Sequence, residues 1–437
     1  MSRGAPSRLL LWTSFVVFCT LGMAYQPFAE LKLPFVGHGT YYEVLVLAAG
    51  VLGLGTLMRT GGGLERSRAR TMCRILMAYL LFEVLVVIPV AVWLGTVTAT
   101  AILNTVAVRF TWLLFPVVLT LCADERERRV LGAVAVAAAV CLAVWGVYSA
   151  ATGGAGYYLE EGYLRYRVLY GGGTLLFAWP FVLAVSGAVS RRYAIPLLGV
   201  SLVGLTLTNH RSGLIAFAIA GLVCIAMSER VRRLVLWIVP AALIATFVLL
   251  LWGQQVGSVF GYTLSHLLDL GSGNGADRLM RWRLAWDYFA SRPFNDYVWS
   301  WRYYLVYMQN AYEPHNFIGG IAVTEGIAGL IFYGSALTSS LWGVWRWGRK
   351  DAEARALIGY LIAYFVFTFA NANWYSQLNF ALFVGAVAAL VARVDQLRVV
   401  EVSHVPKGEA EPDSHLARTR PKNLLRQPAT SEAGGAS

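Results

Sequence analysis

The feature that most constrains the fold is a series of long apolar runs. Runs of about 17–22 residues recur along the 437-residue chain, and that length crosses the ~30 Å hydrocarbon core of a bilayer as an α-helix. Helices satisfy their own backbone hydrogen bonds in lipid, and the sequence lacks the alternation typical of membrane strands. We therefore predict an all-α polytopic membrane protein.

The runs predict about twelve transmembrane helices, near residues 9–25, 40–58, 75–95, 104–122, 130–151, 169–189, 194–208, 212–228, 234–252, 317–341, 357–374 and 377–392. We interpret the first as an uncleaved span, with a cleaved signal peptide as the alternative. One larger outer loop, 253–316, separates helices nine and ten. Residues 1–397 then form a single transmembrane domain, and the polar residues 398–437 form a disordered cytoplasmic tail.

The basic residues predict the orientation in the membrane. With the N-terminus in the cytoplasm, 26 of the 36 Lys and Arg fall in the segments predicted to be cytoplasmic, which are 1–8, 59–74, 123–129, 190–193, 229–233, 342–356 and 393–437. This bias is the positive-inside pattern, so the net charge of +12 indicates topology and not nucleic-acid binding. Nine basic residues on the outer side oppose the pattern and need a local reason: Lys32, Arg165, Arg167, Arg211, Arg278, Arg281, Arg283, Arg292 and Arg302.

Cysteine and histidine usage argues against two classes of site. The five cysteines form no CxxC pair and the six histidines form no HExxH motif. We therefore expect neither a disulfide framework nor a bound metal.

The outer loop contains a basic, helix-like run from Asp277 to Pro293, with Asp277 as its expected cap. At 100° per residue one face carries Arg278, Arg281, Trp282, Ala285 and Phe289. Arg283 and Asp287 lie on the opposite side at i,i+4 and are expected to form a solvated ion pair. Arg278 is then either a ligand for an anionic substrate or a contact for a phospholipid headgroup.

A second outer arginine, Arg211, lies in the turn 208–213. Only 35 residues, 194–228, serve two spans, so this turn must be tight and close to the membrane plane. An arginine there is costly unless it meets an anion, a carboxylate or water, although snorkelling to the outer headgroups is the alternative. We expect His210 to be a surface residue of the turn.

His315 and Glu325 bracket the start of the next span. A neutral histidine can accept a proton near pH 7, as a general base must, but a simple interfacial residue is the alternative. Glu325 lies ten residues further on, about 15 Å deeper in a straight helix. It is either a functional carboxylate or a helix-packing partner, because Gly326 and Gly329 favour close helix approach.

Arg165 and Arg167, in the loop 158–173, either pair with Glu160 and Glu161 or extend the outer basic patch. Arginine forks suit phosphate oxygens. Outer arginines with a histidine above lipid would fit a diphosphate carried on a polyprenyl chain, with the histidine deprotonating an acceptor hydroxyl.

Several of these residues stand in the spacing of a known family. They are the Thr-x-x-Arg of Thr208 to Arg211, the Arg278, Trp282 and Pro293 series, Pro314-His315-Asn316, Glu325-Gly326 and Gly329-Leu330. Over about 208–330 the sequence resembles the bacterial O-antigen ligases and O-antigen polymerases. It departs from them at Phe294–Tyr297, where the family often has Gly-x-Gly, and in its short outer loop, so ligase and polymerase both stay open.

The resemblance implies a membrane glycosyltransferase of lipopolysaccharide biosynthesis, in the bacterial inner membrane with its site facing the periplasm. A ligase transfers a glycan from undecaprenyl diphosphate to a sugar hydroxyl of lipid A-core, with inversion and with no metal or cofactor. A polymerase uses a second lipid-linked repeat as acceptor. His315 would be the general base, and Arg211 and Arg278 would hold the diphosphate.

The same resemblance and the residue types give a predicted substrate-binding set of Arg211, Arg278, Arg281, Trp282, Asn316, Arg165 and Arg167. The expected partners are the lipid-linked donor, the acceptor and membrane lipids, with a homo-oligomer left open. A transporter of lipid-linked sugars and a structural partner of a polysaccharide machine are the alternatives. Charges gathered at the outer surface, not deep in several spans, favour the transferase.

Overall fold

A computed structural model describes residues 68–93, 112, 114–122, 124–152, 156–160, 163–169, 173–228, 274–294, 316–369 and 377–403. The predicted spans 9–25, 40–58 and 234–252, together with His315 and the tail beyond 403, lie outside these residues. The chain divides into two compact units, Met1–Gln396 and Leu397–Ser437, and the packing below is that of the first unit.

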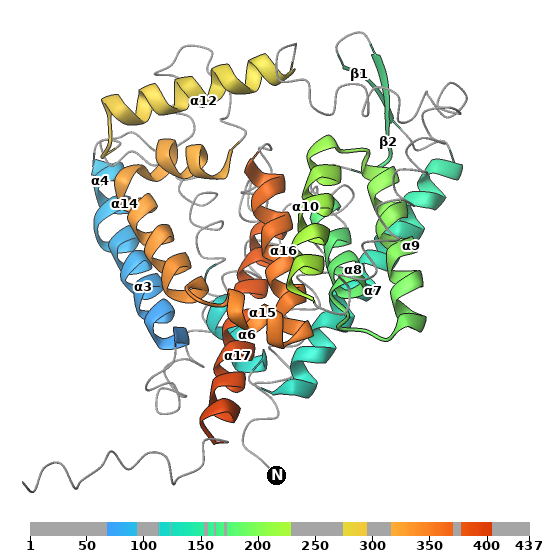
Figure 1. The fold of residues 1–437 in the computed structure, drawn as a ribbon. Coiled ribbons are helices and arrows are strands. Elements are labelled where there is room, and N and C mark those ends of the chain that lie inside the picture. Colours follow the sequence, from blue (N-terminus) through green and yellow to red (C-terminus); the bar gives the residue numbers. More distant parts are fainter. Residues whose placement is uncertain are drawn as a thin grey trace, which may run out of the picture. The chain divides into compact units, whose positions relative to one another are not determined.

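The described chain is helical apart from one hairpin (Figure 1). Its helices are α3 (Arg68–Phe82), the π-helical turn η1 (Glu83–Val87), α4 (Ile88–Trp93), α6 (Leu114–Cys122), α7 (Glu125–Ala151), α8 (Thr174–Ser186), α9 (Arg191–Thr208), α10 (Arg211–Met227), α12 (Asn274–Ser291), α14 (Phe317–Leu341), α15 (Trp345–Lys350), α16 (Ala352–Phe369) and α17 (Gln377–Ser403). Strands β1 (Gly156–Glu160) and β2 (Tyr163–Arg167) pair antiparallel. The helical fold class is confirmed, and this hairpin, in a predicted outer loop, is an exception that the sequence did not indicate.

Four of the described helical stretches are long and apolar enough to cross a membrane: Arg70–Val90, Glu125–Ala151, Glu325–Lys350 and Ala352–Phe369. Two shorter apolar helices are Thr174–Ser186 and Arg211–Met227. The predicted span 317–341 has the same bounds as α14, and the predicted span 212–228 differs from α10 by one residue at each end. The chain is a helical membrane protein, and the count of twelve spans stays a prediction.

Glycines let the central helices α8, α9, α10 and α16 approach closely. A Cβ added at Gly204 would lie 2.1 Å from the Phe177 ring, and one at Gly213 would lie 2.5 Å from the side chain of Thr174. Helix association in lipid depends on such packing contacts, because lipid tails are as apolar as the side chains they would replace. These glycines therefore hold α9 and α10 against α8 close to the turn that carries Arg211.

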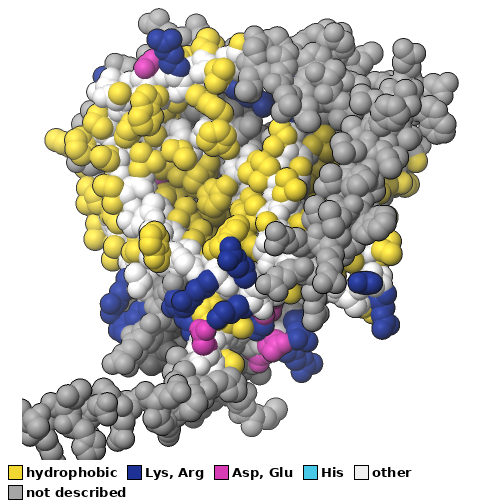
Figure 2. All heavy atoms as spheres, in the orientation of Figure 1, with side chains coloured by type: hydrophobic (Ala, Val, Ile, Leu, Met, Phe, Trp, Pro, Cys, Tyr) yellow, Lys and Arg dark blue, Asp and Glu magenta, His cyan; other side chains and the backbone are white. Residues whose placement is uncertain are grey.

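One end of the bundle is held by ion pairs. Arg128, buried at the start of α7, donates from Nη2 to Oε2 of Glu353 at 3.0 Å and from Nη1 to Oε1 of Gln396 at 2.7 Å. Arg393 donates from Nη2 to Oδ2 of Asp351 at 2.7 Å. These contacts join the connectors 123–129 and 342–356 to the segment from 393, three pieces predicted to be cytoplasmic. Figure 2 shows Lys and Arg side chains gathered at this end, below a hydrophobic zone.

Candidate functional site

The turn between α9 and α10 is as tight as the sequence predicts. α9 ends at Thr208 and α10 begins at Arg211, so only two residues connect them. Asn209 takes the left-handed conformation with φ 41° and ψ 53°, which asparagine tolerates better than most residues. The Thr208 hydroxyl donates to the carbonyl of Gly204 at 2.9 Å. Arg211 is half-buried in the first turn of α10, where the helix dipole adds positive potential.

His210, expected at the surface of this turn, is in fact buried. Its Nδ1 lies 2.7 Å from the hydroxyl oxygen of Ser212, and its ring lies 5.2 Å from that of Phe367. The expectation was wrong because Ser212 satisfies a ring nitrogen and Phe367 covers the ring. His210 therefore fixes the turn against α16, directly before Arg211.

The β1–β2 hairpin is attached to the same turn. The backbone N–H groups of Val168 and Leu169, directly after β2, both donate to the carbonyl of Leu207 at 3.0 Å. The strand register places Tyr158 opposite Arg165 and Gly156 opposite Arg167, so Glu160 stands directly opposite neither arginine. The backbone thus brings the end of β2 to the Arg211 turn, and both predicted roles of Arg165 and Arg167 stay open.

Helix α12 carries the Arg278 motif and begins earlier than predicted. It runs from Asn274, so Asp277 lies in its first turn and is not its cap. Oδ2 of Asp277 instead pairs with Nη2 of Arg281 at 2.6 Å. A carboxylate in the first turn is still favourable, because it faces the positive end of the helix dipole.

The predicted facing of α12 is confirmed. Ala285 is buried, as is Tyr288 beside it, while Arg283 points to solvent with 86% of its side chain exposed. Nε of Arg283 lies 4.0 Å from Oδ2 of Asp287, so the expected solvated ion pair is present. Arg278 is half-buried on the other side.

Trp282, one turn beyond Arg278, places a buried indole donor at the site, as Trp112 and Trp347 do elsewhere in the described chain. Its indole N–H is buried, and within the described residues it has no hydrogen-bond partner. A buried donor without a partner costs about 1–3 kcal/mol, so an oxygen of a bound ligand would stabilise this side chain. The substrate-binding role of Trp282 stays a prediction.

The aromatic end of α16, formed by Tyr364, Phe365, Phe367 and Phe369, brings the three motifs together. Phe367 contacts His210, next to Arg211. The Phe369 ring lies 4.9 Å from that of Trp282 in α12. Phe317, the first residue of α14, lies 6.2 Å from Tyr364 and 6.0 Å from Phe365 between ring centroids. Sequence reasoning missed these residues, although aromatic residues at a span end are typical of the membrane interface.

The start of α14 is fixed by Asn316. Its side-chain oxygen accepts from the backbone N–H of Ile318 at 2.8 Å and of Gly319 at 3.1 Å, which is the geometry of a helix N-cap. We predicted Asn316 as a substrate contact, and the structure gives its oxygen this capping role. His315, the preceding residue, lies outside the described residues.

α14 is broken at Gly326, where φ is 60° and ψ is −153°, a conformation essentially restricted to glycine. The amide N–H of Ile327 donates instead to the carbonyl of Pro293, at 2.7 Å. Figure 1 shows the segment before the break running in a different direction from the rest of α14. The break comes directly after Glu325, so the depth of about 15 Å expected for Glu325 stays a prediction.

Glu325, immediately before the break, is buried and accepts a hydrogen bond from the hydroxyl of Tyr79 in α3. A Cβ at Gly329 would lie 2.6 Å from Oε2 of Glu325. The Arg278–Pro293 and Glu325-Gly326-x-x-Gly329 motifs, about thirty residues apart in sequence, therefore meet at one point.

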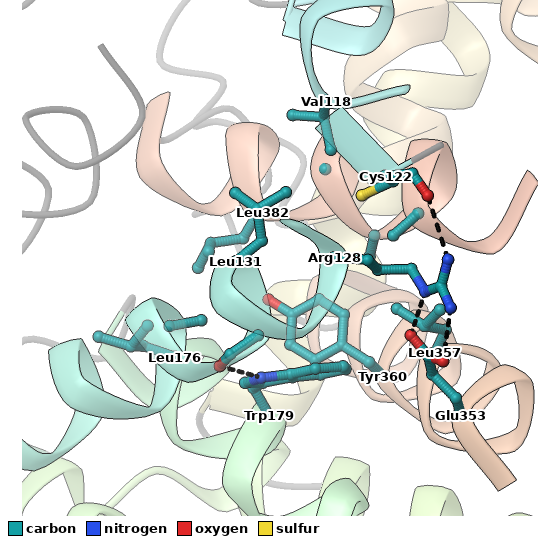
Figure 3. Close-up of a pocket in the computed structure, with 15 residues that line it drawn as sticks. Val118, Cys122, Arg128, Leu131, Leu176, Trp179, Glu353, Leu357, Tyr360 and Leu382 are labelled. Atoms are coloured by element: carbon teal, nitrogen blue, oxygen red, sulfur yellow. Dashed lines mark hydrogen bonds and ion pairs between the residues drawn. The ribbon is translucent and has the colours of Figure 1, made fainter. Parts of the chain in front are cut away.

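A cavity of about 90 Å³ lies at the other end of the bundle, among α6, α7, α8, α16 and α17 (Figure 3). Its walls are mostly apolar, and Arg128 with Glu353 closes one side. Trp179 crosses its floor and donates to the carbonyl of Gly132 at 3.0 Å. None of the predicted site residues lines it, and its volume is well below the roughly 300–1,000 Å³ of typical ligand pockets. The cavity is therefore too small to be an alternative glycan-binding site.

No group of three or more His, Cys, Asp or Glu side chains that could hold a metal occurs among the residues that the structure describes. The arrangement on the α16 end is instead cationic and aromatic. Such a surface can bind a phosphate by charge and by N–H donation and can pack against a sugar or a lipid.

Comparison with known proteins bears on this end of the molecule. No curated protein matches the chain. A family model described as O-antigen ligase matches residues 196–334. That range includes the Arg211 turn, α12 and the broken first part of α14, which are the pieces that the aromatic end of α16 assembles. The resemblance to the O-antigen ligase superfamily, noted over about 208–330, is thus confirmed over residues 196–334.

Proposed function

We propose that this protein is an O-antigen ligase that transfers a glycan from undecaprenyl diphosphate to a sugar hydroxyl of lipid A-core. One observation carries the proposal. Three motifs of the ligase domain, separated by up to a hundred residues of sequence, pack on the same aromatic end of α16. Such convergence is expected of a substrate site and is not required by the packing of membrane helices.

Arg211 and Arg278 hold the diphosphate in this proposal. Arg211 adds its guanidinium to the positive end of α10. α12 carries Arg278, Arg281 and Arg283 against Asp277 and Asp287, so the helix has more positive than negative charge. As the bond from sugar to phosphate breaks, negative charge grows on the leaving diphosphate, and fixed cations stabilise it most at that moment.

His315 acts as the general base toward the acceptor hydroxyl. It directly precedes Asn316, whose capping bonds fix the backbone at the start of α14. A helix N-terminus disfavours a positive charge, which favours the neutral imidazole that a base requires. The reaction takes no cofactor, because the diphosphate leaving group makes the transfer favourable. Arg165, Arg167, Arg281, Trp282 and Asn316 complete the proposed binding set.

The site faces the periplasm from the bacterial inner membrane, where both lipid-linked substrates reach it from the bilayer. The proposed partners are the donor, the lipid A-core acceptor and membrane lipids. Lysine and arginine gathered at the opposite end (Figure 2) support this orientation through the positive-inside rule.

The deciding experiment supplies purified protein with undecaprenyl-diphosphate glycan and one of two acceptors. Growth of lipid A-core is the expected result. Growth of a second lipid-linked repeat would show a polymerase instead. Movement of the donor across a vesicle membrane with no new glycosidic bond would show a transporter and contradict the proposal.

Arginine variants test the diphosphate site within the same assay. Arg211→Ala and Arg278→Ala should each reduce transfer roughly 10- to 150-fold, since one hydrogen-bonded contact to a charged group is worth about 1.5–3 kcal/mol. Arg283→Ala is the matched control, because this exposed arginine belongs to the same helix as Arg278. A loss with Arg283→Ala that exceeds the loss with Arg278→Ala would contradict the assignment.

A further inference from the structure

We propose that Tyr79 and Glu325 form a positioning pair that sets the geometry between α12 and the first part of α14. The pair would fix the direction of residues 317–325 relative to the arginines of the site, and the inference thus rests on the proposed function. Neither side chain would touch the substrate. Their contribution is to fix the direction of α12 and of the first part of α14, which carry groups that would touch the substrate.

The first support is the contact itself. Tyr79, in α3, is 1% exposed and Glu325 is 4% exposed, and the Tyr79 hydroxyl donates to Oε2 of Glu325. The Tyr79 ring also packs on the rings of Phe332 and Tyr333, at centroid distances of 5.0 and 5.6 Å. A buried carboxylate is costly without a donor, so the bond ties the end of the first part of α14 to α3.

The second support is the space left for the carboxylate. Gly329 lies one turn beyond Glu325, and a Cβ there would come within 2.4 Å of the Glu325 Cβ. Only glycine therefore permits the observed direction of the Glu325 side chain. The same helix face thus provides both the carboxylate and the room for it.

The third support is the break that follows at once. Gly326 interrupts the helix with φ 60° and ψ −153°, and the freed N–H of Ile327 is bonded to the carbonyl of Pro293 at 2.7 Å. Pro293 comes two residues after the end of α12. α3, α12 and α14 therefore meet close to the break in α14, where Glu325 is held by its side chain and Ile327 by its backbone.

The consequence concerns distance and orientation. Residues 317–325 form a short helical arm that begins at the Asn316 cap and ends at the pair. If the pair is broken, the arm keeps the Phe317 contacts at its start but loses its tie to α3 at its end, so its direction changes. A misplacement of about 1 Å from a change far from the chemistry can cost about 100-fold in rate. Binding of the donor to the arginines would change less, because α12 keeps its own contact with Phe369.

The test uses the full-length protein in lipid nanodiscs and three variants. Tyr79→Phe removes the donor hydroxyl and keeps the ring. Glu325→Gln keeps an oxygen that can accept the same bond but can take no proton. Tyr360→Phe is the matched control, since it removes another buried tyrosine hydroxyl, which lines the cavity at the other end of α16.

Tyr79→Phe should lower kcat about 10- to 100-fold with the donor KM within about threefold of wild type. Glu325→Gln should lower kcat much less than Tyr79→Phe does, because the amide oxygen can still accept the Tyr79 bond. Tyr360→Phe should leave kcat unchanged. Hydrogen exchange followed by mass spectrometry gives a second readout that requires no turnover. Amides of 317–327 should exchange faster in Tyr79→Phe, while those of α10 should not change.

Two results would overturn the proposal. An inactive Glu325→Gln beside a nearly normal Tyr79→Phe would assign proton chemistry to Glu325. Unchanged exchange and unchanged kcat in Tyr79→Phe would reduce the pair to simple packing. The exchange data also separate this inference from the proposed function, because they test the arm even if purified wild-type protein transfers no glycan.

Discussion

The two ends of the described bundle treat arginine in opposite ways. At one end Arg128 and Arg393 bind Glu353 and Asp351, so two cations meet two carboxylates. At the other end the turn before Arg211 and the helix that carries Arg278 are held by aromatic rings of α16. The first end contains a clamp whose own charges balance, and the second is a cationic surface whose parts are positioned by apolar contacts.

The difference separates arginines that stabilise the fold from those that fit a function. Burying a charge requires a partner, and the clamp supplies one within the fold. An arginine that must bind an anionic substrate cannot also be neutralised by a permanent buried carboxylate. Aromatic contacts of about 0.5–1.5 kcal/mol each can position a segment without adding a charge, and at the α16 end they hold His210, next to Arg211, and Trp282, one turn from Arg278.

The largest expected effect is the all-or-none labelling of a residue from one side of the membrane. Exposed Arg283 in α12 and exposed Arg349 in α15 mark the two ends. A membrane-impermeant thiol reagent should label Arg283→Cys in intact cells and Arg349→Cys only after the inner membrane is opened. Parallel labelling of the unsubstituted protein controls for its own cysteines. The reverse labelling pattern would place the end that carries Arg211 and Arg278 in the cytoplasm and would contradict the proposed periplasmic site.

The next effect concerns the base at the cationic end. His315→Ala should lose about 10²–10⁴-fold in transfer rate while donor binding persists. His315→Gln should be almost as poor, because an amide can form a hydrogen bond but cannot take the proton. His404→Gln, in the predicted tail, is the control. Normal turnover in His315→Gln would show that the residue only positions substrate, and the base would then be sought at Glu313 or Glu325.

The sequence predicted the helical class, the tight turn at Arg211, the facing of α12 and the bounds of α14. These follow from local rules: the length of an apolar run, the helical period, and the small number of residues left for a turn between two spans. The burial of His210, the break at Gly326 and the Tyr79–Glu325 contact could not be predicted. Each depends on a partner more than thirty residues away in the sequence.

The same limit applies to the site. Candidate residues could be selected because arginine in an outer turn is costly without an anion. Their assembly on Phe367 and Phe369 could not be predicted, since apolar residues in a membrane span face protein or lipid with little difference in sequence pattern. Asn316 shows the reverse case, because a residue selected as a substrate contact also serves as a helix cap.

A smaller effect is expected at the clamp. Arg128→Met removes the guanidinium that pairs with Glu353. Glu353 still has Arg393 nearby, with 3.5 Å between Nε of Arg393 and Oε2 of Glu353. The protein should lose about 1–3 kcal/mol of stability, with little change in transfer per folded molecule. Arg129→Met is the matched control, because its exposed pair with Glu125 should contribute less than about 1 kcal/mol. Thermal unfolding of both variants in detergent measures the difference, and equal losses would contradict the clamp.

The smallest expected effect is the pH dependence of this clamp. Burial would raise the pKa of Asp351, but hydrogen bonds from Arg393 and from the Ala354 amide outweigh it and hold the pKa below its ordinary 3.8. The folded pKa is therefore lower than the unfolded one, so the unfolded chain binds more protons between the two values. The stabilisation by Asp351 is complete above the unfolded pKa and is lost as pH falls through the folded pKa. Midpoints of thermal unfolding should fall more steeply with acid in wild type than in Asp351→Asn. Parallel curves for the two proteins would show that the Arg393–Asp351 bond does not contribute to stability, and the clamp would then depend on the contacts of Glu353 with Arg128 and Arg393.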